Sequence, residues 1–221
     1  MLGIKSFIAI YSLKIYKKVT LALCKGMVIF MKSHFFAYLM RMKNIKRWGL
    51  MRNTEPENIK EHSLDVAYIA HALAAIGNNL YNRNCNTEHI VMLAIYHDIS
   101  EVITGDLATP IKYFNPEIKD AYKKIEDVSV EKLRNMIPPE ILPEYNCLCP
   151  SNNSYENMIV KAADKISAYF KCIEELKSGN REFATAKDAL LVQINEINLP
   201  EIAYFMNTFA DSISLTLDEL N

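Results

Sequence analysis

The chain has 221 residues, of which 50% are hydrophobic and 23% are charged. Only six glycines and eight prolines occur, which favours long helices and argues against a β-sandwich or barrel with many turns. A formal net charge of -1 excludes the strongly basic character typical of proteins that bind a nucleic-acid polymer, whereas a small anionic substrate needs only a few local cations.

Residues 1–30 differ in composition from the rest of the chain. They contain five lysines and no acidic residue, while the remaining residues carry 20 basic and 26 acidic side chains. Lysines interrupt the apolar runs too often for a transmembrane helix, and the run VTLALC is too short for a signal peptide. We expect an N-terminal extension outside the active site, with a catalytic domain over 31–221. An amphipathic helix on a membrane surface is the alternative.

The first half of this domain is predicted to contain three helices. Apolar residues at helical spacing predict a helix over 34–44, and the polar segment RWGLMRNTEPEN that follows predicts a loop. Asn58 is a candidate N-cap for a helix over 59–76, and we expect Leu64 on its buried face. A third helix is predicted over 87–103.

Proline and glycine divide the second half of the domain. The segment TGDLATP at 104–110 predicts a loop, and Pro116 is predicted to begin a helix that ends near residue 136. Further helices are predicted over 154–176, over 182–197 and from Pro200 onward. No segment alternates apolar and polar residues over enough positions to form a strand. We therefore expect an all-α fold, a single helical bundle.

The clearest chemistry is carried by the segment YHDISEVITGD. Within it, His97 and Asp98 offer an imidazole nitrogen and a carboxylate oxygen to a divalent cation. Glu101 follows Asp98 by three positions, so the two would share a face of one helix, and Glu101 is a candidate acid or base. His62 and Asp164 lie in apolar helical segments, where a carboxylate needs a partner or a metal ion. Taken alone, a histidine such as His62 or His97 is more often a packing or surface residue than a ligand, and Asp164 could form a salt bridge with Lys161 or Lys165.

Other catalytic motifs do not occur. The glycines are too scattered for a phosphate-binding loop, and no G-x-S-x-G motif presents a nucleophilic serine. The five cysteines are odd in number and irregularly spaced, which suggests neither a disulfide framework nor a zinc ribbon.

The order of the histidines and aspartates resembles that of the HD-domain superfamily of metal-dependent phosphohydrolases. The strings ENIKEHSLDVA, LAIYHDISEVITGDLATPIKYFN and KAADKISAYFKCIEEL are similar, in the same order, to those of the bacterial HD-domain 5'-deoxynucleotidase family. The similarity extends over 31–221. It implies an HD-domain helical bundle that hydrolyses deoxyribonucleoside 5'-monophosphates to deoxyribonucleosides and phosphate, and that acts as a cytoplasmic homodimer without a membrane or nucleic-acid partner.

The resemblance also implies roles for individual residues. It makes Glu101 the acid or base and Arg47 the residue that orients the phosphate. The implied metal ligands are His62, His97, Asp98 and Asp164. The implied substrate-binding residues are Arg47, Trp48, Asp98, Asp106, Leu107, Ala108, Thr109 and Asp164. The family usually has proline where this chain has Ala108, which bears only on the stiffness of that loop.

A ligand set of two imidazoles and two carboxylates suits one divalent metal ion. The resemblance points to cobalt as an activator in vitro, with manganese, zinc or iron as further candidates. In this interpretation the indole of Trp48 occupies the space that a 2'-hydroxyl would need, and Asp106 accepts a hydrogen bond from the 3'-hydroxyl.

Three alternatives remain open at this point. The first is another HD-type enzyme: a nucleoside triphosphohydrolase, a guanosine tetraphosphate hydrolase or a cyclic-nucleotide phosphodiesterase. A two-metal phosphodiesterase would need additional histidine ligands, and the chain has only five histidines. The second is a non-catalytic nucleotide-binding module, and the third is a form attached to a membrane through residues 1–30.

Overall fold

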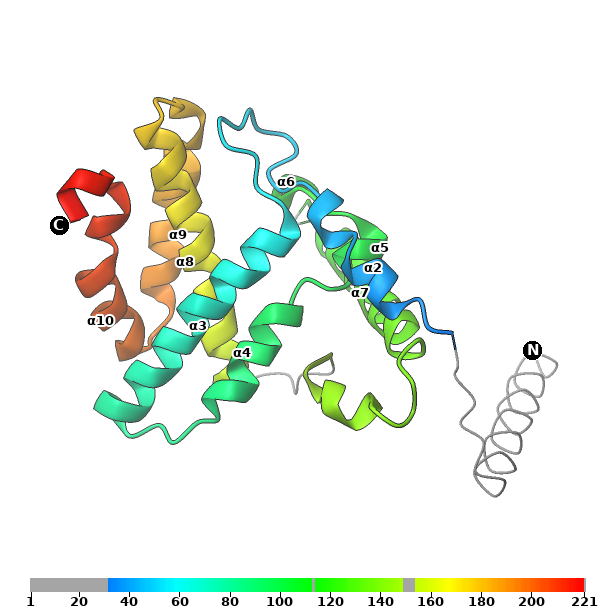
Figure 1. Ribbon diagram of the computed structural model, residues 1–221. Helices are drawn as coiled ribbons and strands as arrows, with labels where there is room; N and C mark the ends of the chain where they lie inside the picture. Colours follow the sequence, from blue (N-terminus) through cyan, green and yellow to red (C-terminus); the bar gives the residue numbers. More distant parts are fainter. Residues whose placement is uncertain (1–31, 113, 149–153, 221) are drawn as a thin grey trace, which may run out of the picture. The chain divides into compact units, whose positions relative to one another are not determined.

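The computed structural model describes residues 32–112, 114–148 and 154–220 (Figure 1). The expected extension over 1–30 lies outside these residues. All of the described helices belong to one compact unit, residues 34–221. The described residues form helices and one isolated antiparallel bridge, Lys46–Asn58, and no strand. The expected all-α fold is confirmed.

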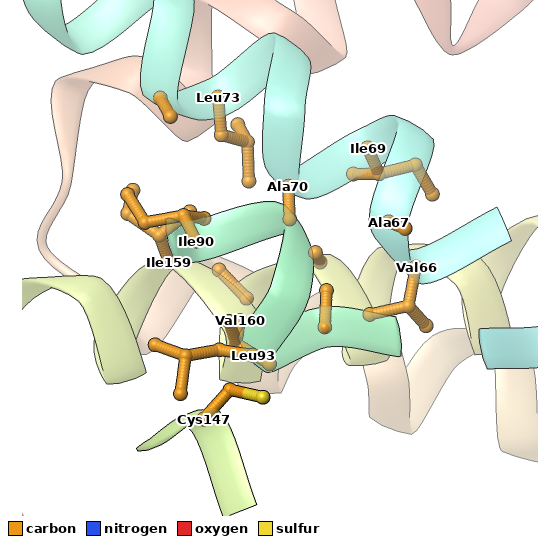
Figure 2. Packing of buried hydrophobic residues seen from close by; sticks show 14 of the residues in the cluster. Val66, Ala67, Ile69, Ala70, Leu73, Ile90, Leu93, Cys147, Ile159 and Val160 are labelled. Carbon is orange, nitrogen blue, oxygen red and sulfur yellow. The ribbon is translucent and has the colours of Figure 1, made fainter. Parts of the chain in front are cut away.

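The centre of the domain is the helix α3 (Ile59–Tyr81), which contacts α4 (Thr87–Tyr96), α8 (Tyr155–Lys177) and α10 (Pro200–Phe209). The buried faces of α3, α4 and α8 meet in one apolar cluster, which Figure 2 shows from close by. Fully buried members of this cluster include Leu73, Ile90 and Ile159. Each such side chain contributes about 1.5–3 kcal/mol by leaving water. The same three helices also position the candidate site.

Side-chain caps begin most of the long helices. The Asn58 side chain accepts hydrogen bonds from the backbone N–H groups of Lys60 and Glu61 at 3.0 and 3.1 Å, as its predicted N-cap role requires. The helix α3 continues beyond residue 76 and ends at Tyr81, followed by Asn82, which adopts a left-handed conformation with φ 52°. Asn86 caps α4 in the same way.

Two expectations about these helices are wrong. Leu64 is 48% exposed, because the buried face of α3 is formed by its neighbours at 62, 63, 66 and 67. The helix predicted over 87–103 is interrupted: α4 ends at Tyr96, and a separate short helix, α5 (Glu101–Thr104), follows a turn. That turn contains His97 and Asp98.

The helix predicted over 34–44 is divided into the short helix α2 and the 3-10 helix η1, and the other elements follow the predicted order with small shifts in their ends. No described helix combines the length and the apolar character needed to cross a membrane. The bounds are α2 (Phe35–Leu39), η1 (Met42–Asn44), α6 (Thr109–Lys112), α7 (Pro116–Arg134), η2 (Leu142–Leu148), η3 (Arg181–Phe183), α9 (Ala184–Glu196), η4 (Asp211–Ser214) and η5 (Leu217–Leu220). The short helix α6 lies partly within the segment predicted as a loop.

A buried ion pair fastens the loop between η1 and α3 to α8. The carboxylate of Glu175 accepts hydrogen bonds from the backbone N–H of Thr54 at 2.8 Å, from that of Glu55 at 3.1 Å and from the Asn180 side chain at 2.8 Å. Lys171 Nζ donates to Glu175 and to the carbonyl oxygen of Glu55. Burial raises the pKa of Glu175, but Lys171 and these donors lower it to about 2. The loop is therefore held by a charged partner.

Candidate active site

Four predicted site residues converge from three parts of the fold. His62 lies in the first turn of α3, His97 and Asp98 lie in the turn after α4, and Asp164 lies in α8. His62, His97 and Asp164 each offer a ligand atom, and these atoms lie within 4.8 Å of one another. Asp98 Oδ2 lies 3.1 Å from His97 Nε2 and 3.8 Å from His62 Nε2.

Each imidazole is oriented by a contact of its Nδ1 atom, the nitrogen that does not point to the cluster. His97 Nδ1 lies 2.7 Å from the carbonyl oxygen of Ala94, so Nδ1 carries the proton that it donates there. His97 Nε2 then points to the cluster, where it is buried and makes no hydrogen bond to a described residue, although Asp98 Oδ2 lies 3.1 Å away. His62 Nδ1 lies 3.2 Å from Ser167 Oγ, and His62 Nε2 lies 3.0 Å from Asp164 Oδ1.

This donor set fits a divalent cation. Two imidazole nitrogens and two carboxylates suit borderline metals such as zinc, cobalt, manganese and iron. Since His97 Nε2 makes no hydrogen bond within the described part of the chain, it is the kind of buried polar atom that normally requires a ligand. The outward hydrogen bonds of both imidazoles also match the outer contacts that hold metal-binding histidines.

The charges of the cluster favour ionised carboxylates. Burial raises the pKa of Asp164, but the hydrogen bond from His62 and the neighbouring imidazoles outweigh it, and the pKa lies below its usual value. Burial also raises the pKa of Asp98, but the effect of the neighbouring His97 is larger, and the pKa lies below its usual value. Burial and the Arg47 charge lower the pKa of His62. Both aspartates are therefore anionic at neutral pH.

Asp164 is less enclosed than its apolar sequence neighbours suggested. Its side chain is 42% exposed, because it lies in the wall of a cavity of about 640 Å³ that also contacts His97 and Asp98. The apolar residues around it, such as Ala162 and Ala163, face the core instead. The cavity leaves the cluster accessible from the side of α7 and α8.

Glu101, the candidate acid or base, is a buried carboxyl group at the start of α5. Its side-chain atom Oε2 has no hydrogen-bond partner in the described ranges, and its backbone N–H donates to the carbonyl oxygen of Asp98 at 3.0 Å. Burial, together with the negative charges of Asp98 and Asp106, raises its pKa to about 9. Glu101 therefore carries a proton at neutral pH.

Arg47 and Trp48 lie in the loop after η1. Arg47 Nη1 is buried and has no hydrogen-bond partner among the residues that the structure describes, while Arg47 Nε lies 3.6 Å from Glu57 Oε2. Trp48 Nε1 donates a 3.0 Å hydrogen bond to the same oxygen, and the indole lies 5.2 Å from the ring of Phe183. Arg47 thus has donor capacity left for an anion.

Among the described residues over 106–109, only Asp106 has interactions with other residues of the candidate site. Burial raises the pKa of Asp106, and the Arg47 charge and the Trp48 backbone oppose this rise, so Asp106 lies near both. Leu107 and Ala108 are half-buried, and Thr109 is exposed at the first position of α6. The substrate roles of these three residues stay predictions.

The sequence analysis missed two residues at the site, Glu57 and Ser167. Glu57 contacts Arg47 and Trp48, and its Oε1 lies 3.8 Å from His62 Nδ1. Ser167 is bonded to His62. Their only sequence signals were weak: Glu57 precedes the N-cap Asn58, and Ser167 follows Asp164 by one helical turn.

A family profile and individual relatives both assign the chain to the same family. The sequence profile described as 5'-deoxynucleotidase YfbR-like matches residues 34–213. A 5'-deoxynucleotidase of Vibrio parahaemolyticus is 54% identical over 192 residues, which cover 86% of this chain and 99% of the relative. A 5'-deoxynucleotidase of Vibrio cholerae has the same identity and coverage, and one of Yersinia pestis is 52% identical over 191 residues, or 86% of this chain and 97% of the relative.

Solved structures agree with the fold. An HD-domain phosphohydrolase of Listeria innocua has a TM-score of 0.72 at 24% identity, covering 81% of this chain and 88% of the other. A cyanophage S-2L HD phosphohydrolase, solved with dA and one catalytic Zn²⁺, has a TM-score of 0.58 at 21% identity, covering 86% and 100%. At these identities the likeness concerns the arrangement of helices.

Proposed function

Because the chain belongs to the YfbR-like 5'-deoxynucleotidase family, we propose that it hydrolyses deoxyribonucleoside 5'-monophosphates to deoxyribonucleosides and phosphate. The observation that carries this proposal is the convergence of His62, His97 and Asp164 on one point, with Asp98 beside them. A protonated Glu101 on the element that follows Asp98 supplies the second part of a phosphohydrolase site.

We assign the metal to His62, His97, Asp98 and Asp164. A divalent cation bound there would lower the pKa of water and neutralise charge on the phosphate. Cobalt is the proposed activator in vitro, and manganese, zinc and iron are the other candidates, because mixed imidazole and carboxylate ligands do not discriminate strongly among them. Asp98 and Asp164 also face the position of the substrate phosphate in this assignment.

The protein's own residues bind the phosphate and move a proton. Arg47 donates to a phosphate oxygen from its buried nitrogen Nη1, which no described residue engages in a hydrogen bond. This orients the phosphate and offsets its charge. Water adds to phosphorus while the bond from phosphorus to the 5'-oxygen breaks. Glu101, protonated at neutral pH because of its raised pKa, gives its proton to that leaving oxygen and then takes up the proton that the attacking water loses.

The sugar is assigned to Trp48 and the segment that follows Gly105. In this assignment the indole of Trp48 excludes a 2'-hydroxyl, and Asp106 accepts a hydrogen bond from the 3'-hydroxyl. Leu107, Ala108 and Thr109 complete the sugar-binding loop. The proximity of Asp106 to Arg47 and to the Trp48 backbone supports this arrangement.

A substrate panel tests the activity. We expect the purified protein, supplied separately with Co²⁺, Mn²⁺ and Zn²⁺, to release phosphate from dAMP much faster than from AMP, dATP or cyclic AMP. Predominant hydrolysis of dATP or cyclic AMP would instead identify another HD-type phosphohydrolase. Binding of dAMP without turnover under every metal would identify a nucleotide-binding module.

Replacing a ligand tests the metal assignment. His62→Ala should abolish stoichiometric Co²⁺ binding and activity together. His71→Ala is the matched control, since His71 lies on the same helix with an exposed side chain. Retention of tight Co²⁺ binding by His62→Ala would refute the assignment.

We further propose that residues 31–221 form the catalytic unit and that the enzyme is a cytoplasmic homodimer. Both parts extend the family relationship to this chain. Light scattering on the full chain should give twice the monomer mass. Fractionation of cells that express the chain with and without residues 1–30 should recover activity in the cytoplasmic fraction in both cases, and recovery with the membranes would contradict this location.

A further inference from the structure

The backbone of Glu57 is fixed from two directions. Its carbonyl oxygen accepts a 3.1 Å hydrogen bond from the Arg47 N–H, and the next residue forms both the antiparallel bridge to Lys46 and the N-cap of α3. The loop that leaves at Trp48 therefore returns beside its own start. Glu57 joins this closed loop to the helix that carries His62.

The Glu57 carboxylate contacts three residues of the proposed site. One oxygen, Oε2, accepts the 3.0 Å hydrogen bond from Trp48 Nε1 and lies 3.6 Å from Arg47 Nε. The other, Oε1, lies 3.8 Å from His62 Nδ1, on the side of the imidazole opposite to the nitrogen that faces Asp164. With a side chain only 10% exposed, Glu57 is enclosed among these partners and is not itself in the metal cluster.

These contacts determine which groups remain available to a substrate. The Nε edge of Arg47 faces Glu57, which leaves the buried Nη1 without a partner among the described residues. Trp48 has a positive φ of 59°, a conformation that a bulky residue adopts only when its surroundings hold it there. Its indole is fixed at Nε1 by Glu57 and at one side by the ring of Phe183.

We propose that Glu57 is a positioning residue. It fixes how far the Trp48 indole reaches into the proposed site and the direction in which the Arg47 guanidinium points. Its effect on substrate choice rests on the proposed function: by fixing the indole, Glu57 sets the preference for deoxyribose over ribose. Its effect on the Trp48 side chain does not depend on that function.

The chain offers a direct probe, because Trp48 is its only tryptophan. We compare Glu57→Leu, which removes the acceptor of the indole N–H, with Glu57→Gln, whose amide oxygen can still accept it. Glu61→Leu and Glu61→Gln are matched controls, since Glu61 is an exposed residue in the first turn of α3. Circular dichroism establishes that each variant has the wild-type helix content.

The expected results separate positioning from a general structural role. Glu57→Leu should shift the Trp48 emission to longer wavelength and increase its quenching by acrylamide, while Glu57→Gln and both Glu61 variants keep the wild-type spectrum. For dAMP, Glu57→Gln should raise KM about tenfold through the weakened hold on Arg47, with a smaller change in kcat. The ratio of kcat/KM for dAMP to that for AMP should fall about tenfold in Glu57→Leu and rise again toward wild type in Glu57→Gln.

The outcomes distinguish this proposal from the proposed function. A wild-type protein inactive on every nucleotide would refute the proposed function, while a shifted spectrum in Glu57→Leu would still support the positioning of Trp48. Unchanged emission and quenching in a folded Glu57→Leu would overturn the positioning role even in an active deoxynucleotidase. An unchanged dAMP-to-AMP ratio alongside a shifted spectrum would overturn the role in sugar selection.

Discussion

The buried pair of Lys171 and Glu175 gives a prediction about stability that the structure quantifies. Lys171 is 5% exposed and Glu175 is 1% exposed, and Glu175 also accepts hydrogen bonds from the backbone N–H groups of Thr54 and Glu55. Glu175→Gln leaves the lysine charge buried without its counterion, which costs about 3–5 kcal/mol. The new amide NH₂ also faces backbone N–H donors, so one of those hydrogen bonds is lost as well. The cost just given includes this loss.

Urea unfolding at neutral pH measures this loss, with Glu174→Gln as control. Glu174 is the preceding residue of α8 and is exposed, so its replacement makes the same change of charge without breaking the pair. We expect about 3–5 kcal/mol less free energy of unfolding for Glu175→Gln and a change within about 0.5 kcal/mol for Glu174→Gln. Equal effects of the two variants would refute the reasoning.

The dependence on pH supplies an independent check. The pKa of Glu175 is lowered to about 2 in the folded chain, from about 4.3 in an unfolded chain. A lowered pKa stabilises the fold fully above the unfolded value, and this stabilisation is lost as the pH falls toward the folded value. The difference in free energy of unfolding between wild type and Glu175→Gln should therefore be constant above about pH 5 and shrink below it. A difference that grows in acid would contradict this account.

Three further predictions concern single side chains. Glu101→Gln should lower kcat by about 10²–10⁴-fold because the amide has no acidic proton to give, while the dissociation constant for dAMP, measured by calorimetry, stays near that of wild type. Ser167→Ala removes the partner of His62 Nδ1 and should weaken Co²⁺ binding about 10–100-fold in a chelator competition. Gly77→Ala would place a methyl group 2.5 Å from Tyr155 Oη and should lower the free energy of unfolding by about 1–3 kcal/mol; an unchanged melting temperature would contradict the close packing there.

The sequence predicted those elements whose signals are local. An asparagine at position 58 followed by a long periodic apolar segment is sufficient for the start of α3, because both the cap and the buried face lie within a few turns. The end of α4 had no such signal. No glycine or proline interrupts residues 94–103, and the helix ends where His97 Nδ1 bonds to Ala94 and its Nε2 points to the cluster.

The residues of the candidate site likewise divide into those that the sequence predicted and those that only the structure shows. The histidines and aspartates were identified from residue type, order and family resemblance, and the structure brings them within a few ångströms. The contacts of Glu57 were not predictable, since a glutamate in a polar loop is ordinary and its three contacts exist only after the loop closes on α3. Glu175 was missed for the same reason: its partners Thr54 and Glu55 are more than a hundred positions away in the sequence.

These two glutamates explain how an irregular loop can hold residues that are proposed to act in catalysis. Backbone N–H groups in a loop lack the carbonyl partners that a helix supplies, and buried ones need another acceptor. The Glu175 carboxylate accepts from the backbone N–H groups of Thr54 and Glu55. At the beginning of the loop, the Glu57 carbonyl oxygen accepts from the Arg47 backbone N–H, and the Glu57 carboxylate accepts from the indole N–H of Trp48. Because Glu57 adjoins α3 and Glu175 belongs to α8, the loop is fastened to the two helices that carry His62 and Asp164. Groups proposed to bind phosphate and metal therefore share one rigid frame, and loosening either glutamate should displace Arg47 relative to the metal cluster.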